Sequence, residues 1–366
     1  MKNTNIGDVD KNLAITGKIQ GVELVFYNVR HDPFRIYGLI FDSEGEPFRR
    51  IPCGVAERVN PGVLRLHTNT AGGRVRFMTD SARVAIRAIM PKKCLMPHMP
   101  FLGSSGFDMY VKEGEKNFYK GSFVPPVDRA NSYESCIELG SRKMRDITIH
   151  FPLYDGVNDL LIGVEPDAVV EAGGAYGSEL PIIYYGSSIT QGGCASRPGN
   201  CYTNIISRNL NTDHINLGFS GSGRGELVMA DYIAAQPMSL FVFDYDHNAP
   251  NVDHLSKTHE AFFLAIREMH PDLPIIMASR TDTPKTLQIE EETIRRREVI
   301  LNTYENALKR GDKQVRFVDG IKVFNTCNEM GATPDSCTVD GVHPNDLGFA
   351  CMANVFGKAI KEMLNT

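Results

Sequence analysis

The feature that most constrains the fold of this chain is a regular alternation of strand and helix patterns after Pro181. Five short apolar runs, rich in β-branched and aromatic residues, have the length and composition of buried strands. They are residues 182–185, 214–217, 240–244, 275–279 and 315–318. Helical patterns lie between and after them, at 202–210, 227–235, 255–269, 286–309 and 347–363. Strands that alternate with helices form a parallel sheet with helices on both faces, so we predict a doubly wound α/β domain of five parallel strands.

The first half of the chain has a different pattern, with short segments that partly alternate between apolar and polar residues. The predicted strands are 22–27, 63–66, 74–78, 82–88 and 146–151, and turn signals such as Asn60-Pro61-Gly62 separate some of them. No apolar period of helical length occurs there, so we predict an antiparallel β-sandwich. A chain of 366 residues is long enough for two domains. We place the sandwich at residues 1–175 and the α/β domain at 176–366.

Composition excludes several classes of partner. The net charge of −5 and the pI near 6.1 give no basis for a nucleic-acid partner. No run of 18 apolar residues is present, which argues against a membrane partner, and the polar first eleven residues lack the apolar stretch of a secretory signal. We therefore expect a cytoplasmic protein.

The eight cysteines are scattered without a C-x-x-C pair, which favours reduced thiols over a disulfide framework or a zinc site.

The loops that follow the predicted strands carry the residues of interest. In a doubly wound sheet these loops meet at one edge, where such folds bind their ligands. The first strand ends in Gly186-Ser187-Ser188, and the segment before the last helix contains Asp340 and His343. A serine hydroxyl needs a base to act as a nucleophile, and a histidine needs a third group to hold its tautomer. Ser188, His343 and Asp340 are therefore predicted to be nucleophile, general base and orienting carboxylate.

Two further loops supply groups that can stabilise a developing oxyanion. The second strand leads into a glycine-rich segment with Gly221, and the third strand leads into a segment with Asn248. We predict that the backbone N–H groups of Ser188 and Gly221 and the side-chain amide of Asn248 form an oxyanion hole. Taken singly, these residues could be ordinary turn or helix-cap residues. The catalytic interpretation is favoured because all four loops map to the same edge of the sheet.

The second half of the chain resembles the SGNH (GDSL-type) hydrolase superfamily. The first block appears as Gly186-Ser187-Ser188-Ile189-Thr190, where Ser187 replaces the usual aspartate, and the last block, Asp340-Gly341-Val342-His343-Pro344, matches Asp-x-x-His-Pro in full. The second block's glycine falls on Gly221. The third block is the weakest match, with Asn248 as its asparagine and Asn251 as a possible substitute. The resemblance implies a flavodoxin-like sheet, the site roles above and no cofactor. The first half is similar to the jelly-roll-like β-sandwich ahead of the hydrolase domain in some bacterial members, including carbohydrate esterases.

A metal site is the competing chemical interpretation of the third loop. Acidic and imidazole side chains, which are common ligands in hydrolytic metalloenzymes, gather in this region. They are Asp244, Asp246, His247, Asp253, His254 and His259. His254 and His259 are five residues apart, however, which places them on different sides of a helix. We therefore expect no metal.

The hypothesis from sequence is a serine esterase that removes a small acyl group. The resemblance implies acetyl as the acyl group and an acylated sugar as the substrate. A thioesterase or lysophospholipase is an alternative acylhydrolase. A second alternative is a catalytically inert glycan-binding protein, motivated by Ser187 and by the irregular third block. Acyl chain length, the alcohol part of the substrate and oligomeric state are not encoded in any motif, and residues 101–107 are predicted to be a flexible loop.

Overall fold

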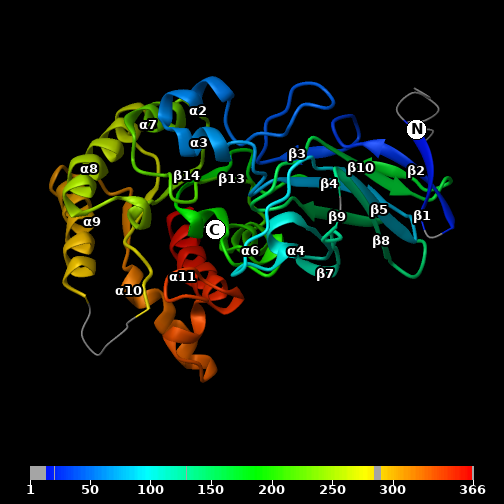
Figure 1. The fold of residues 1–366 in the computed structure, drawn as a ribbon. Coiled ribbons are helices and arrows are strands. Elements are labelled where there is room, and N and C mark those ends of the chain that lie inside the picture. The colour runs from blue at the N-terminus through cyan, green and yellow to red at the C-terminus, as the bar shows by residue number, and fades with distance from the viewer. Residues whose placement is uncertain (1–13, 20, 129, 284–289, 365–366) are drawn as a thin grey trace. The chain divides into compact units, whose positions relative to one another are not determined.

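The computed structural model describes residues 14–19, 21–128, 130–283 and 290–364, which form two compact units (Figure 1). The first unit comprises Met1–Arg50, Thr68–Tyr176 and Ser196–Gly199, and the second comprises Ile51–His67, Gly177–Ala195 and Asn200–Thr366. Each unit thus includes a short segment from the half of the sequence that mainly forms the other. Among the described residues, no helix is long and apolar enough to span a membrane.

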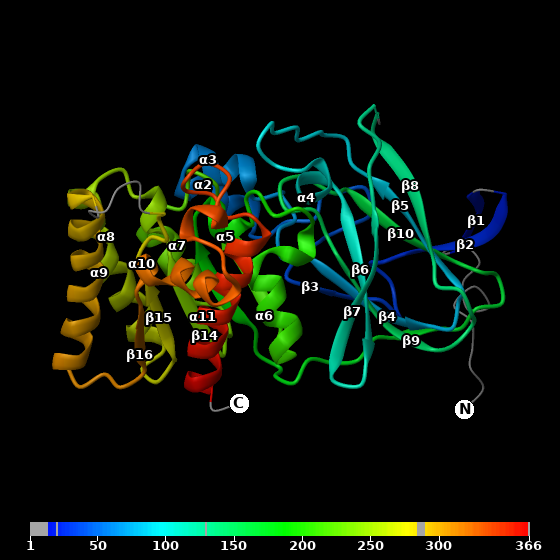
Figure 2. The ribbon, with the colours of Figure 1, turned by 90° about the horizontal axis from the view of Figure 1, so that it is seen from below.

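The first unit consists of two antiparallel sheets (Figure 2). One has the order β1(Ala14–Ile19), β2(Val22–Asn28), β10(Asp159–Val164), β5(Arg83–Ile89) and β8(Ser132–Glu138). The other has the order β11(Val170–Ala172), β4(Arg74–Thr79), β9(Arg145–His150), β6(Phe107–Glu113) and β7(Lys116–Phe123), with β3(Arg35–Tyr37) paired to β4. Alternate residues of both sheets, such as Phe77 and Ile86, meet in one buried core. The predicted antiparallel sandwich is confirmed.

Residues 63–66 are helical, so their prediction as a strand is wrong. They lie in α3(Pro61–Leu66), which follows α2(Cys53–Val59). The side-chain oxygen of Asn60 accepts a hydrogen bond from the Val63 N–H at 2.9 Å, and Pro61 occupies the first helical position. This pair is a helix start signal as well as a turn signal. The helix of six residues is too short to show a 3.6-residue apolar period.

The segment at 101–107, predicted to be a flexible loop, is also ordered. Phe101–Ser105 forms helix α4, and β6 starts at Phe107. Ser104 is fully buried, and its hydroxyl oxygen lies 3.0 and 3.2 Å from the carbonyl oxygens of Cys94 and Phe101, either of which can accept its proton in a hydrogen bond. The serines and glycines of this segment therefore serve close packing rather than mobility.

The second unit contains the predicted five-stranded parallel sheet, in the order β13(His214–Gly218), β12(Ile182–Gly186), β14(Leu240–Asp244), β15(Ile275–Ala278) and β16(Val315–Val318). The order 2-1-3-4-5 is that of flavodoxin-like folds, so the predicted fold class is confirmed. The principal helices are α6(Tyr202–Leu210), α7(Leu227–Ala234), α8(Val252–Met269), α9(Glu291–Lys309) and α11(Asp346–Leu364). Shorter helices are α5(Ser188–Gln191) and α10(Gly320–Val323), and residues 286–289 of one predicted helix lie outside the described residues.

The helices pack on both faces of this sheet (Figure 1). On one face, Tyr184 of β12 makes an edge contact with Tyr202 of α6, which stacks in turn on Phe349 of α11. On the other face, Tyr185 of β12 stacks on Phe262 of α8 with ring centroids 5.0 Å apart. The alternation of side chains along a strand thus builds two aromatic layers. Together they make β12, the strand that precedes Ser188, fully buried.

Gly186, at the end of β12, is required by its neighbours. A Cβ atom there would lie 2.0 Å from the Thr190 hydroxyl oxygen and 2.3 Å from the backbone oxygen of Asp244. We expect Gly186→Ala to lower the free energy of unfolding by roughly 1–3 kcal/mol, because a backbone atom cannot move aside cheaply. Urea unfolding measures this as a shift of the midpoint at constant m. Gly54→Ala in α2 is the control, because no atom lies within 4 Å of the Cβ position at residue 54. The stability of this variant should not fall.

Candidate active site

The turn after β12 presents Ser188 at the first position of α5. Ser187 precedes this helix, is fully buried, and accepts a hydrogen bond from the Ile189 N–H on its hydroxyl at 3.1 Å. Ser187 therefore acts as the N-cap, a function that serine and aspartate perform about equally well. This explains in physical terms why a serine can occupy position 187, where the family that the chain resembles has aspartate. Gly192, with φ +102°, ends the helix after four residues.

Ser188, His343 and Asp340 lie in one hydrogen-bonded chain. The Ser188 Oγ is 3.0 Å from His343 Nε2, and His343 Nδ1 is 2.7 Å from Asp340 Oδ2. The other carboxylate oxygen, Asp340 Oδ1, accepts the backbone N–H groups of His343 at 2.8 Å and Val342 at 3.0 Å. An ionised carboxylate can only accept a hydrogen bond, so it favours the tautomer with the proton on Nδ1, which leaves the Nε2 lone pair directed at the serine hydroxyl. The structure thus brings together residues 155 positions apart.

The electrostatic environment keeps the Asp340 carboxylate ionised. Partial burial tends to raise its pKa, but the hydrogen bonds from the His343 backbone and ring and from the Val342 backbone outweigh burial and lower the pKa to about 2. The carboxylate therefore remains charged at any pH at which a neutral histidine can act as a base. It can stabilise an imidazolium throughout that range.

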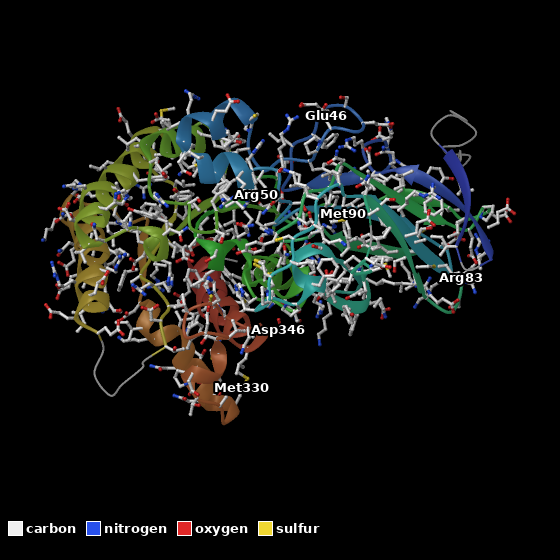
Figure 3. All side chains as sticks on the ribbon, in the orientation of Figure 1. Glu46, Arg50, Arg83, Met90, Met330 and Asp346 are labelled. Atoms are coloured by element: carbon white, nitrogen blue, oxygen red, sulfur yellow. The ribbon has the colours of Figure 1, made fainter. Side chains whose placement is uncertain are left out.

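The loop that carries these residues is held by partners that the sequence did not indicate. Gly341, at φ +88°, lies between Asp340 and Val342, and its carbonyl oxygen accepts a hydrogen bond from the Thr283 hydroxyl at 2.9 Å. Just beyond the loop, Asp346 begins α11 (labelled in Figure 3) and accepts a bond from Asn200 Nδ2 at 2.8 Å. Thr283 and Asn200 belong to segments with no recognisable motif, so only the folded chain could identify them.

The structure separates Asn248 and Asn251, the two asparagines considered for the oxyanion hole. Asn248 Nδ2 donates to the Phe219 carbonyl oxygen at 2.8 Å, which places the Asn248 side chain beside the loop that carries Gly221. Gly221 has φ +67°, and its N–H forms no hydrogen bond within the described part of the chain. Asn251, in contrast, is exposed and caps α8 by accepting the His254 N–H at 2.8 Å. The geometry therefore favours Asn248 over Asn251 as a neighbour of Gly221.

The residues considered as metal ligands have other partners in the structure. The Asp246 carboxylate pairs with the buried Arg296 guanidinium at 3.1 Å, and His247 Nε2 accepts the Thr281 N–H at 3.1 Å. His259 stacks on the ring of Phe243. Among the described residues, no group of three or more His, Cys, Asp or Glu side chains is arranged to hold a metal ion.

Asp244, the last residue of β14, is a buried acid whose ionisation opposes folding. Burial raises its pKa, against the effect of hydrogen bonds from Tyr202 and Thr190, to about 8. An unfolded aspartate titrates near pH 4, so the unfolded chain binds fewer protons between about pH 4 and 8. The contribution of neutral Asp244 to stability is therefore complete below pH 4 and is lost as the pH rises towards 8.

We accordingly expect the free energy of unfolding of the parent protein to fall with rising pH relative to Asp244→Asn. The slope of this difference should reach about 1.4 kcal/mol per pH unit inside the window, because asparagine can accept the same hydrogen bonds but cannot ionise. Urea unfolding at pH 5, 6.5 and 8 gives the measurement. Asp253→Asn, on the exposed surface of α8, provides the control and should follow the parent at every pH.

The geometry described above is that of a site able to carry out acyl transfer through a serine nucleophile. Residues 179–361 match the GDSL-like lipase/acylhydrolase family, and residues 24–170 match the N-terminal region of SGNH-hydrolase-type esterases. The chain belongs to the GDSL-like lipase/acylhydrolase family and is a serine hydrolase that acts on acyl esters. No match was found among curated protein sequences.

Several solved structures are similar over nearly the whole chain. A protein described as a GDSL-like lipase from Bacteroides ovatus ATCC 8483 is 28% identical, with a TM-score of 0.82 over 93% of this chain and 98% of its own. The salicylyl-acyltransferase SsfX3 of a tetracycline biosynthetic pathway is 21% identical, with a TM-score of 0.73 over 93% and 97%. A family two carbohydrate esterase from Clostridium thermocellum is 14% identical, with a TM-score of 0.61 over 92% and 99%. At these identities, the last two show a shared fold only.

Proposed function

We propose that this protein hydrolyses a short acyl ester, with acetyl as the preferred acyl group, on a hydroxylated carbohydrate. The observation that carries the proposal is the continuous chain of hydrogen bonds from Ser188 Oγ through His343 to Asp340, at 3.0 and 2.7 Å. The carbohydrate substrate draws support from similar structures described as carbohydrate esterases and as an acetyl xylan esterase from Butyrivibrio proteoclasticus.

In the proposed mechanism, His343 Nε2 takes the hydroxyl proton as Ser188 Oγ attacks the ester carbonyl carbon. Negative charge then develops on the carbonyl oxygen, where the N–H groups of Ser188 and Gly221 and the amide of Asn248 can donate hydrogen bonds. Asp340 stabilises the imidazolium that forms and does not itself take up the proton.

Collapse of the tetrahedral intermediate breaks the bond to the alcohol oxygen, and the His343 imidazolium protonates the departing alkoxide. The products at this stage are the free alcohol and an acyl-Ser188 ester. Water, deprotonated by the same histidine, then attacks this ester and releases the carboxylic acid and the free serine hydroxyl. No step of this sequence uses a cofactor.

Two measurements on one preparation test the proposal. Treatment with a fluorophosphonate, followed by peptide mapping, should place the label on Ser188, while Ser187→Ala protein should be labelled at the same residue. Acetate release from acetylated xylo-oligosaccharides should exceed acid release from the matching butyrylated compounds. Binding of the sugar without labelling or turnover would instead identify an inert glycan-binding protein, and faster hydrolysis of acyl thioesters or lysophospholipids would identify the other acylhydrolases.

A further inference from the structure

The helix pair α2–α3 belongs to the second unit although it lies in the first half of the sequence. Asn60 joins the two helices, and its side chain has two separate functions. The carbonyl oxygen caps α3 by accepting the Val63 N–H at 2.9 Å. The amide nitrogen donates to the Ser222 carbonyl oxygen at 2.9 Å and to Glu226 Oε1 at 2.6 Å. Helix capping needs only the oxygen, so the amide contacts require another explanation.

Ser222 directly follows Gly221, the proposed oxyanion donor, in a loop whose other backbone groups are engaged. The Phe219 carbonyl oxygen accepts from Asn248 Nδ2, and the Ser220 N–H donates to Gln191 Oε1 at 3.0 Å. The N–H groups of residues 219, 222 and 223 donate to backbone carbonyl oxygens at 2.8–3.0 Å. Across residues 219–223 of the described chain, the Gly221 N–H is the one backbone N–H without an acceptor.

Close packing couples α3 to this loop. A Cβ atom on Gly62 would lie 2.0 Å from Ser222 Oγ and 2.8 Å from Ser222 Cβ, so the helix backbone contacts the serine side chain directly. Gly221 itself has no atom within 4 Å of its Cβ position. Its carbonyl oxygen accepts hydrogen bonds from the Arg224 guanidinium at 3.1 and 3.3 Å, but its N–H has no acceptor among the described residues. The direction of this N–H therefore depends on how the neighbouring peptide groups are held.

From these contacts we infer that Asn60 is a positioning residue for the oxyanion site. Its amide fixes the Ser222 carbonyl group, and Gln191 and Asn248 fix the loop on the other side of Gly221, so that the Gly221 N–H is oriented before substrate arrives. Oxyanion donors contribute to rate mainly because they are oriented in advance. The inference rests on the proposed function, since it requires that Gly221 donates to the reacting oxygen.

Asn60→Asp is the variant that tests it. Aspartate caps α3 as well as asparagine does but cannot donate to Ser222 or to Glu226. We expect kcat for p-nitrophenyl acetate to fall by about tenfold, a part of the 10²–10³-fold loss that follows removal of an oxyanion donor. KM should stay within about twofold, because the donor acts in the transition state more than in the bound substrate. Unchanged kcat would overturn the inference.

Asn251→Asp is the matched control, because Asn251 also caps a helix from an extended backbone conformation and its cap lies on an exposed surface. If Asn251→Asp lowered kcat as much as Asn60→Asp does, the loss would be a general result of changing a helix cap, and the inference would be overturned. Gly62→Ala gives an independent disturbance of Ser222 with Asn60 intact, and it too should lower kcat without a matching change in KM. If Gly62→Ala protein had the same kcat as the parent, this result would also contradict the inference.

The double variant Asn60→Asp/Glu226→Gln separates the two contacts of the amide. A glutamine at 226 can donate to the introduced carboxylate, which restores the lost hydrogen bond and removes the repulsion between the two acids. Thermal stability should recover while kcat remains low, since the Ser222 carbonyl group still lacks its donor. Full recovery of kcat would show that only the link to Glu226 matters. A wild-type protein with no esterase activity would instead mark failure of the proposed function.

Discussion

Replacement of Ser188 by alanine is expected to lower kcat for p-nitrophenyl acetate by roughly 10⁵–10⁶-fold, the largest effect of any single change in the chain. Without the hydroxyl no acyl-enzyme can form, and only direct attack of water, aided by the oxyanion donors, remains. The fold should persist, because alanine fits the helical backbone of α5. Ser188 is 8% exposed, and the hydroxyl that alanine lacks faces His343. Steady-state kinetics and fluorophosphonate labelling give the two readouts.

Ser187→Ala is the matched control for this prediction because the two serines are adjacent. Its loss removes the N-cap of α5 and should lower stability by about 1 kcal/mol, with a far smaller effect on kcat than the change at Ser188. If Ser188→Ala protein hydrolysed p-nitrophenyl acetate at the parent rate, no covalent mechanism through Ser188 could stand. A similar loss of activity in both variants, with lower stability in both, would indicate damage to the turn instead.

The α/β unit could be predicted from sequence because its central strands are buried on both faces. Such strands appear as uninterrupted apolar runs, as at 182–185 and 240–244, and the long helices between them show clear periods. Several strands of the first unit lack this signal. β7, for example, lies at the edge of its sheet and has only one buried residue, with lysines at 116 and 120, so its sequence has little apolar alternation.

The candidate site could be predicted only where the proposed function requires particular residue types next to a strand end. Ser188, Gly221, Asn248 and His343 follow strands or precede the last helix, and the fold brings these positions to one edge of the sheet. Asn60 could not be found in this way, because its contact with Ser222 spans 162 residues. The contact also depends on α3, whose residues 63–66 are predicted from sequence to be a strand. Contacts of that kind are set by tertiary packing, and no local pattern encodes them.

Asp340→Asn should retain the fold and lower kcat by about 10⁴-fold. The asparagine carbonyl oxygen can still accept the two backbone N–H groups that Asp340 Oδ1 accepts from Val342 and His343. The amide group then faces His343 Nδ1, where it can donate but not accept. The imidazole must therefore carry its proton on Nε2, and this nitrogen can no longer take the proton of Ser188.

The pH dependence of this variant distinguishes loss of tautomer control from general damage. An asparagine at 340 has no charge with which to stabilise the imidazolium, so the acid limb of the kcat profile should move to lower pH. Asp335→Asn, at an exposed position in the same segment, should leave both kcat and its pH profile at the parent values. If Asp340→Asn retained full activity with an unchanged profile, Asp340 would not be the group that orients His343, and the base would have to be held by another partner.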